Sequence, residues 1–107
     1  MLSIDPQRYI QAFERAPAVL RDLSGSWETT EVIRALGERY RLEERVSHVA
    51  RMTAYVLVGL LPLAKFRETI QEEAGLDEEA AREIAREIRD KVFARAVEEL
   101  RAMHNIS

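Results

Sequence analysis

The stretch MTAYVLVGLLPLAK, from Met52 to Lys65, decides how this chain folds. The thirteen residues between Arg51 and Lys65 carry no charge, although 33% of the residues in the chain are charged. A membrane-spanning helix needs about 20 apolar residues, so this run predicts a helix buried in a small core instead. Gly59 and Pro62 interrupt the run, which predicts that one helix ends near Gly59 and another begins at Pro62.

Length and composition predict a single all-α domain over residues 1–107. A chain of 107 residues can build one modest core and is too short for two. Hydrophobic residues make up 47% of it, which excludes a disordered chain. Ala, Leu, Glu and Arg dominate over Gly and Pro, and this composition is typical of helices. We expect no strand.

The cysteine count and the first residues bear on location and chemistry. No cysteine is present, which excludes disulfides, thiolate metal sites and cysteine nucleophiles. The opening residues MLSIDPQRY show neither the basic segment nor the apolar core of a signal peptide. A cytoplasmic location is therefore the default expectation.

Charge is nearly balanced at net −3 but unevenly placed. Residues 1–66 hold nine Lys or Arg against eight Asp or Glu, and residues 67–107 hold seven against eleven. An unselective nucleic-acid binder draws its affinity from concentrated positive charge, so this distribution disfavours that class.

The apolar stretch belongs to a predicted helix over about 43–60 whose second half is almost wholly apolar. We expect this helix to be the centre of a compact bundle of about five helices. Upstream of it, Ser26 is a plausible N-cap for a helix over 27–40. Gly37 in that helix would let a neighbouring helix approach closely.

Downstream, a short amphipathic helix is predicted over 62–74, with Gly75 as the residue that ends it. Asp77 is then expected to cap a long C-terminal helix over about 77–103, which contains no helix breaker. Such a helix would reach roughly 40 Å, beyond the expected extent of a domain of this size, so its far end is predicted to contact another chain.

At the N-terminal end, Asp5 followed by Pro6 is a helix start signal, and Pro17 marks the next break. Residues 1–16 therefore form a candidate N-terminal helix of their own. The sequence leaves open whether this helix packs on its own core or on a neighbouring chain.

The segment from Pro17 to Leu100 resembles a small all-helical domain found in hypothetical proteins of uncultivated bacteria, a family without an assigned function. The residues that carry the resemblance are GERYRL at 37–42, VLVGLLP at 56–62 with Phe66, GLDEEAAREIAREI at 75–88, and VF at 92–93. All of them are packing, capping or turn positions, so the resemblance implies a fold and no chemistry. The chain departs from similar ones at Arg41 and Arg95, where Gly or Pro tends to occur.

Candidate ligands for a metal are few. His48 follows Glu44 by four residues, so both side chains could share one helix face. One helix supplies only two ligands, and His104 lies far along the chain in its last residues. We therefore predict no metal site, no cofactor and an exposed His48.

Catalytic constellations are also missing. The serines lack a nucleophile-elbow context, and no Gly-rich phosphate loop occurs; the hydroxyls considered are Ser24, Ser26 and Ser47. Along 82–91 acidic and basic side chains alternate, which predicts helix-surface ion pairs of about 0.2–0.5 kcal/mol each rather than an acid–base site. The sequence thus predicts a protein that is not an enzyme.

A helix-turn-helix that binds nucleic acid is the alternative hypothesis. Its contact residues would lie between Arg34 and Arg51, and the candidates are Arg34, Arg39, Arg41 and Arg45. Glu43 and Glu44 stand at the start of the would-be recognition helix, where they would repel phosphate. Nucleic acid is therefore the less favoured partner.

The leading hypothesis is a helical protein-interaction or structural module that binds a protein partner or forms a homodimer. A wide apolar stripe on the final helix and an exposed aromatic motivate it; the candidate interface residues are Trp27, Phe93, Val97, Leu100 and Met103. Each could equally serve the chain's own core. The hypothesis predicts that Leu100→Glu with Met103→Glu weakens association and leaves helicity intact. A membrane-surface role is disfavoured because the longest predicted helix is acidic.

Overall fold

The computed structural model describes residues 2 and 4–104. Seven α-helices and three short 3₁₀ segments account for most of these residues, and none of them forms a strand. The all-α prediction is confirmed, and the predicted count of about five helices is too low. The α-helices are α1 (Pro6–Arg15), α2 (Ala18–Ser24), α3 (Trp27–Arg39), α4 (Val46–Leu57), α5 (Phe66–Glu73), α6 (Glu78–Lys91) and α7 (Val97–Met103). The 3₁₀ segments are η1 (Glu43–Arg45), η2 (Leu63–Lys65) and η3 (Phe93–Ala96).

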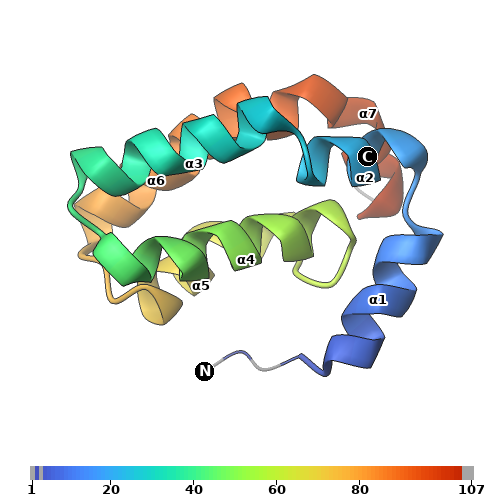
Figure 1. Cartoon of the computed structure of the whole chain (residues 1–107), viewed down its shortest axis with the longest axis horizontal. Helices are drawn as coiled ribbons and strands as arrows, with labels where there is room; N and C mark the ends of the chain where they lie inside the picture. Colours follow the sequence, from blue (N-terminus) through green and yellow to red (C-terminus); the bar gives the residue numbers. More distant parts are fainter. Residues whose placement is uncertain (1, 3, 105–107) are drawn as a thin grey trace.

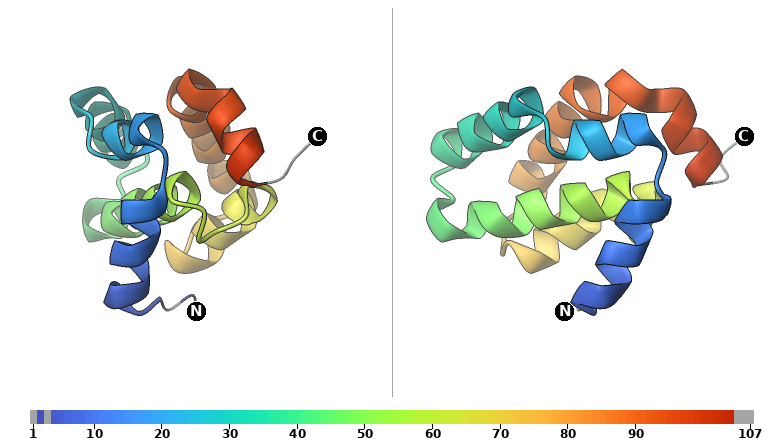
Figure 2. Two further views of the ribbon diagram at one scale, coloured as in Figure 1. Left: turned by 90° about the vertical axis from the view of Figure 1, so that its right-hand side faces the viewer. Right: turned by 45° about the vertical axis from the view of Figure 1, so that its right-hand side comes forward.

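Helices α3, α4, α5 and α6 form an antiparallel four-helix bundle (Figure 1). Each packs on the next in the chain, and α6 closes the ring against α3. The end-on view on the left of Figure 2 shows the four helices at the corners of a square. Helix α2 continues the line of α3 over the second half of α4 (Figure 1) and also packs on α7. The radius of gyration is 12.9 Å, close to the roughly 13 Å expected of a compact chain of this length.

Helix α4 is one corner of the ring, so the expectation of a single central helix needs correction. It packs on α2, α3 and α5, while α6 lies across the bundle from it. Its second half is nevertheless as buried as predicted; the buried residues there are Met52, Thr53, Tyr55, Val56 and Leu57. A four-helix bundle needs no helix at its centre, because each of its helices can turn an apolar stripe toward the shared core.

The predicted helix starts coincide with side-chain caps. Asp5 accepts a hydrogen bond from the Gln7 N–H at 2.8 Å, and Asp77 accepts one from the Ala80 N–H at 2.7 Å. Ser26 does the same for Thr29 at 3.1 Å. These contacts span at most three residues, which is why the sequence alone could locate them.

The turn between α3 and α4 contains two residues in the left-handed region that seldom holds a side chain. Arg41 has φ 53° and Glu43 has φ 55°. Between them Leu42 is buried, and its N–H donates to the Gly37 carbonyl at 2.9 Å. The sharp turn thus puts a leucine into the core, and the helix expected to begin at Glu43 starts with a 3₁₀ turn, becoming α-helical only at Val46.

The predicted continuous helix over 77–103 is broken. Helix α6 begins as expected but ends at Lys91, and η3 redirects the chain before α7 begins at Val97. A straight helix of that length would measure roughly 40 Å, whereas the molecule extends 34 × 27 × 27 Å. The break folds the last residues back, so that Phe93 and Leu100 are both buried.

Helix α1 lies crosswise at one end of the bundle (Figure 1) and contributes no buried residue. It touches the bundle through Tyr9, whose ring centroid is 5.7 Å from that of Tyr55 in α4. Ahead of it, the Leu2 N–H donates to a Glu73 carboxylate oxygen at 3.0 Å. Leu2 and Ile4 also pack against the core, so the N-terminal segment packs on its own chain.

Candidate functional site

Two of the five predicted interface residues belong to the core. Phe93 is 2% exposed and packs edge-on against Phe66, with ring centroids 5.2 Å apart. Leu100 is 1% exposed within α7. The turn at η3 changed which face of the C-terminal segment is turned inward, so neither side chain can contact a partner in the folded chain.

The other three predicted residues lie on different parts of the molecule. Trp27 is 72% exposed at the start of α3, so it does not pack over the helix it opens. Val97 is 46% exposed at the start of α7. Met103 is half-buried, and its Sδ would lie only 2.8 Å from a Cβ added to Gly59. The structure does not bring these residues together into one patch with Phe93 and Leu100.

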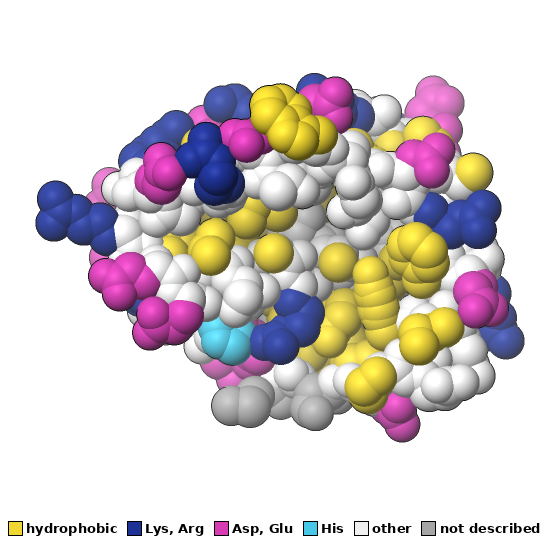
Figure 3. Space-filling view, in the orientation of Figure 1, with side chains coloured by type: hydrophobic (Ala, Val, Ile, Leu, Met, Phe, Trp, Pro, Cys, Tyr) yellow, Lys and Arg dark blue, Asp and Glu magenta, His cyan; other side chains and the backbone are white. Residues whose placement is uncertain are grey.

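Exposed apolar side chains also lie on α1 and at the start of α2. The large hydrophobic side chains exposed there are Ile10, Phe13 and Val19, of which Ile10 is 50% and Phe13 36% exposed. Tyr9 stacks on Phe13 with ring centroids 6.2 Å apart. Figure 3 shows hydrophobic side chains gathered over this region, where α1 meets the end of α4. We call Ile10, Phe13 and the exposed part of Tyr9 the α1 face.

The arginines of the nucleic-acid hypothesis mostly serve the fold. Arg34 pairs with Glu31 at 2.7 Å and also with Glu38, and its hydrogen bond lowers the pKa of the Glu31 carboxyl. Arg39 lies 3.7 Å from a Glu87 oxygen on α6. Guanidinium groups already paired with carboxylates are poor ligands for phosphate, so this geometry weakens the hypothesis.

Arg45 closes the end of α5. Its Nη1 donates to the carbonyl oxygens of Ala74 and Gly75, both at 3.3 Å. Gly75 has φ 61°, the conformation predicted for the residue that ends this helix. The side chain thus satisfies carbonyl groups that a helix terminus leaves without partners.

Arg45→Gln is expected to lower the free energy of unfolding by about 1 kcal/mol, because charge-assisted hydrogen bonds to two carbonyls are lost. Urea titration followed by circular dichroism measures this. Arg41→Gln is the matched control, since within the described residues the Arg41 side chain has neither an ion pair nor a hydrogen bond. Equal midpoints for the two variants would contradict the assigned role of Arg45.

The charges along α6 are paired along the helix only in part. Glu83 accepts a hydrogen bond from the Tyr40 hydroxyl at 2.8 Å, which raises the pKa of Tyr40, and Glu87 contacts Arg39 and Lys91. Of the helix-surface ion pairs predicted over 82–91, the one between Glu87 and Lys91 forms at 3.3 Å, whereas Arg82 and Arg86 form none within the described residues. These arginines instead line a groove toward α5.

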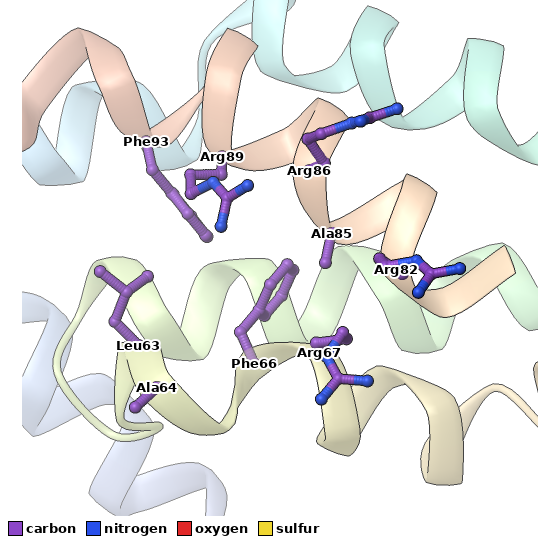
Figure 4. A pocket seen from close by; sticks show the side chains of 9 residues that line it. All are labelled: Leu63, Ala64, Phe66, Arg67, Arg82, Ala85, Arg86, Arg89 and Phe93. Carbon is purple, nitrogen blue, oxygen red and sulfur yellow. The ribbon is translucent and has the colours of Figure 1, made fainter. Parts of the chain in front are cut away.

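The groove between α5 and α6 was missed from the sequence. Its lining residues are Leu63, Ala64, Phe66, Arg67, Arg82, Ala85, Arg86, Arg89 and Phe93 (Figure 4). One pattern could have indicated it, since Arg82, Arg86 and Arg89 recur at spacings of four and three, which places them on one side of a helix. Interleaving with carboxylates obscured this pattern.

The histidines have partners within the chain, and His48 is less exposed than predicted. His48 is half-buried, with Nδ1 2.5 Å from an Arg51 nitrogen. His104 donates from Nε2 to the Val56 carbonyl at 2.9 Å, so it ties the end of α7 to α4. Across residues 2 and 4–104, no group of three or more His, Asp or Glu side chains is placed to hold a metal ion.

The hydroxyls have structural partners as well. Ser26 caps α3, and the Ser47 hydroxyl donates to the Glu44 carbonyl at 2.9 Å. Within the described part of the chain, no helix combines the length and apolar character needed to cross a membrane.

Comparisons of the chain with protein-family models, with curated proteins and with solved structures found no match. The function is therefore argued from this chain's own residues.

Proposed function

We propose that this chain is a non-catalytic helical interaction module that associates with a second copy of itself through the α1 face. The observation that carries the proposal is that α1 turns Ile10 and Phe13 to solvent and buries no side chain. An amphipathic helix gains most of its stability from packing its apolar face. A partner that covers this face would supply the apolar contacts that α1 does not make with the chain's own core.

The α1 face lies on one side of its helix. Ile10 and Tyr9 precede Phe13 by three and four residues, so the three side chains share that side, whereas Arg8 and Gln11 lie on the opposite one. In a two-fold dimer each contact occurs twice with the roles of the two chains exchanged, so Ile10 and Phe13 of one chain would meet the same side chains of the other.

The α1 face also limits the strength of the association. Ten helical residues span only about 15 Å, so two crossed α1 helices bury little area. Stable interfaces bury about 1,600 Å² in total. We therefore expect a weak dimer in exchange with monomer. Trp27 and Val97 lie outside the helix–helix contact and are not assigned to it.

A charge introduced into the α1 face is expected to test the association. Ile10→Glu places a carboxylate in the apolar contact of both chains and is expected to lower dimer affinity about tenfold. Gln11→Glu is the matched control, because it adds the same charge on the opposite side of α1 and should leave the affinity unchanged. Sedimentation equilibrium over a wide concentration range measures the affinity.

Ile10 is 50% exposed and Gln11 is exposed as well, so both changes leave the fold intact, which circular dichroism checks. A chain that stays monomeric at every concentration would contradict the proposal. So would a dimer whose affinity Ile10→Glu leaves unchanged, or one that Gln11→Glu weakens as much.

A further inference from the structure

The groove between α5 and α6 has an apolar floor and a cationic rim. Its floor consists of Phe66, Phe93 and Ala85, all buried, with Leu63 and Ala64 beside them. The cavity encloses about 590 Å³ and is open to solvent along one side. None of the nine residues that line it is acidic.

The rim arginines hold charges that the chain does not neutralise. In the part of the molecule that the structure describes, Arg67, Arg82 and Arg86 make no ion pair or side-chain hydrogen bond. Arg89 approaches Asp90 only to 3.9 Å, between exposed side chains. The groove therefore concentrates positive charge in a chain whose net charge is −3.

Figure 4 shows how these side chains are directed. Arg89 extends into the groove beside the rings of Phe66 and Phe93. Arg67 from α5 and Arg82 from α6 stand at the other end of the groove, on its two sides. Arg86 turns away toward α3, so three of the four guanidinium groups can reach a bound molecule.

The carboxylates of α6 that could have formed ion pairs with these arginines contact other groups. Glu83 is bound by the Tyr40 hydroxyl, and Glu87 by Arg39 and Lys91. The contacts with Tyr40 and Arg39 hold the side chains of Glu83 and Glu87 on the flank of α6 that faces α3. The tertiary structure thus keeps the groove free of competing anions.

We propose that this groove binds a small amphiphilic anion, an aliphatic chain that carries a phosphate or carboxylate head. The aliphatic body would cover the floor, and the head would accept hydrogen bonds from guanidinium groups, whose planar donor pairs match phosphate and carboxylate oxygens. The cavity volume lies in the range of about 300–1,000 Å³ typical of small-molecule sites. This site is separate from the α1 face and does not depend on self-association.

The dimensions favour a small molecule over an acidic helix as the occupant. A docked helix with its side chains is about 10 Å wide and needs a broad open trough. Here α5 and α6 pack directly on each other, and the edge-on pair of Phe66 and Phe93 closes the space between them. What remains is a groove with an apolar floor, which suits an aliphatic chain.

Octyl phosphate is the first probe, titrated into the full chain and followed by backbone amide NMR shifts. Saturable shifts are expected at Ala64, Phe66, Ala85 and Phe93. Octanoate tests the carboxylate head, inorganic phosphate tests the head without the chain, and octanol tests the chain without the charge. We expect both charged amphiphiles to bind, and more tightly than either inorganic phosphate or octanol.

The variant Arg82→Gln with Arg89→Gln is expected to weaken octyl phosphate binding about tenfold for each arginine removed. Arg101→Gln is the matched control, an exposed arginine outside the groove, and should bind as the unaltered chain does. Urea unfolding should be unchanged in both variants because the altered side chains are exposed. The absence of saturable shifts with both charged amphiphiles, equal binding of octanol, or equal affinities of the two variants would overturn the proposal.

Discussion

Leu100→Glu is expected to unfold the chain rather than to weaken an interface. Leu100 is 1% exposed, so a glutamate there would place a carboxylate without a partner in the core of the bundle. Burial of an unpaired charge and loss of the apolar contacts together cost about 4 kcal/mol or more, a large share of the 5–15 kcal/mol by which small domains are stable. Circular dichroism and urea titration measure the loss.

Val97→Glu is the matched control for this prediction. It introduces the same charge into the same helix, but at a side chain that is 46% exposed. Its free energy of unfolding is expected to change by no more than about 0.5 kcal/mol. A Leu100→Glu chain that stays folded and loses only association would contradict the core position and restore the original interface hypothesis.

Gly37→Leu is expected to destabilise the contact between α3 and α4 by about 2 kcal/mol. An ideal Cβ at Gly37 would lie 2.8 Å from Val46 Cγ2 and 3.2 Å from its Cβ. Val46 is β-branched and has few alternative rotamers, so α4 itself would have to move. Overpacking of this kind costs about 1–3 kcal/mol, more than the gain of about 0.8–1 kcal/mol from removing a helical glycine. Urea titration measures the difference.

Ala35→Leu serves as the control for the glycine substitution. Ala35 lies in the same helix and is exposed, so leucine there meets no neighbouring helix. Its stability should stay within about 0.5 kcal/mol of that of the unaltered chain. A Gly37→Leu variant as stable as Ala35→Leu would show that α3 and α4 can separate without cost.

The two proposed surfaces can be tested without disturbing this core. Ile10 and Gln11 on α1 are exposed, as are Arg82 and Arg89 beside the groove. Substitutions at these positions therefore report on binding, whereas those at Leu100 and Gly37 report on folding. Failure of the α1 variants leaves the groove proposal intact, and the reverse also holds.

The sequence by itself determined the helical class and most helix starts. Caps such as Asp5, Ser26 and Asp77 bind backbone N–H groups two or three residues away, and Gly75 ends its helix through its own φ angle. Gly37 was correctly predicted to permit a close helix approach, because the absence of a side chain is visible in the sequence. The caps and the helix end depend on neighbours along the chain, and the close approach depends on a side chain that Gly37 lacks.

Only the tertiary structure decided which apolar and charged side chains face solvent. No breaker marks the turn after Lys91, which arises because the folded segment buries Phe93 and Leu100 against the other helices. In the same way, Glu83 binds Tyr40 and Glu87 binds Arg39 at the end of α3. The arginines of α6 are therefore left to line the groove. Helical periodicity shows which residues share a face, but the position of neighbouring helices determines whether that face is covered.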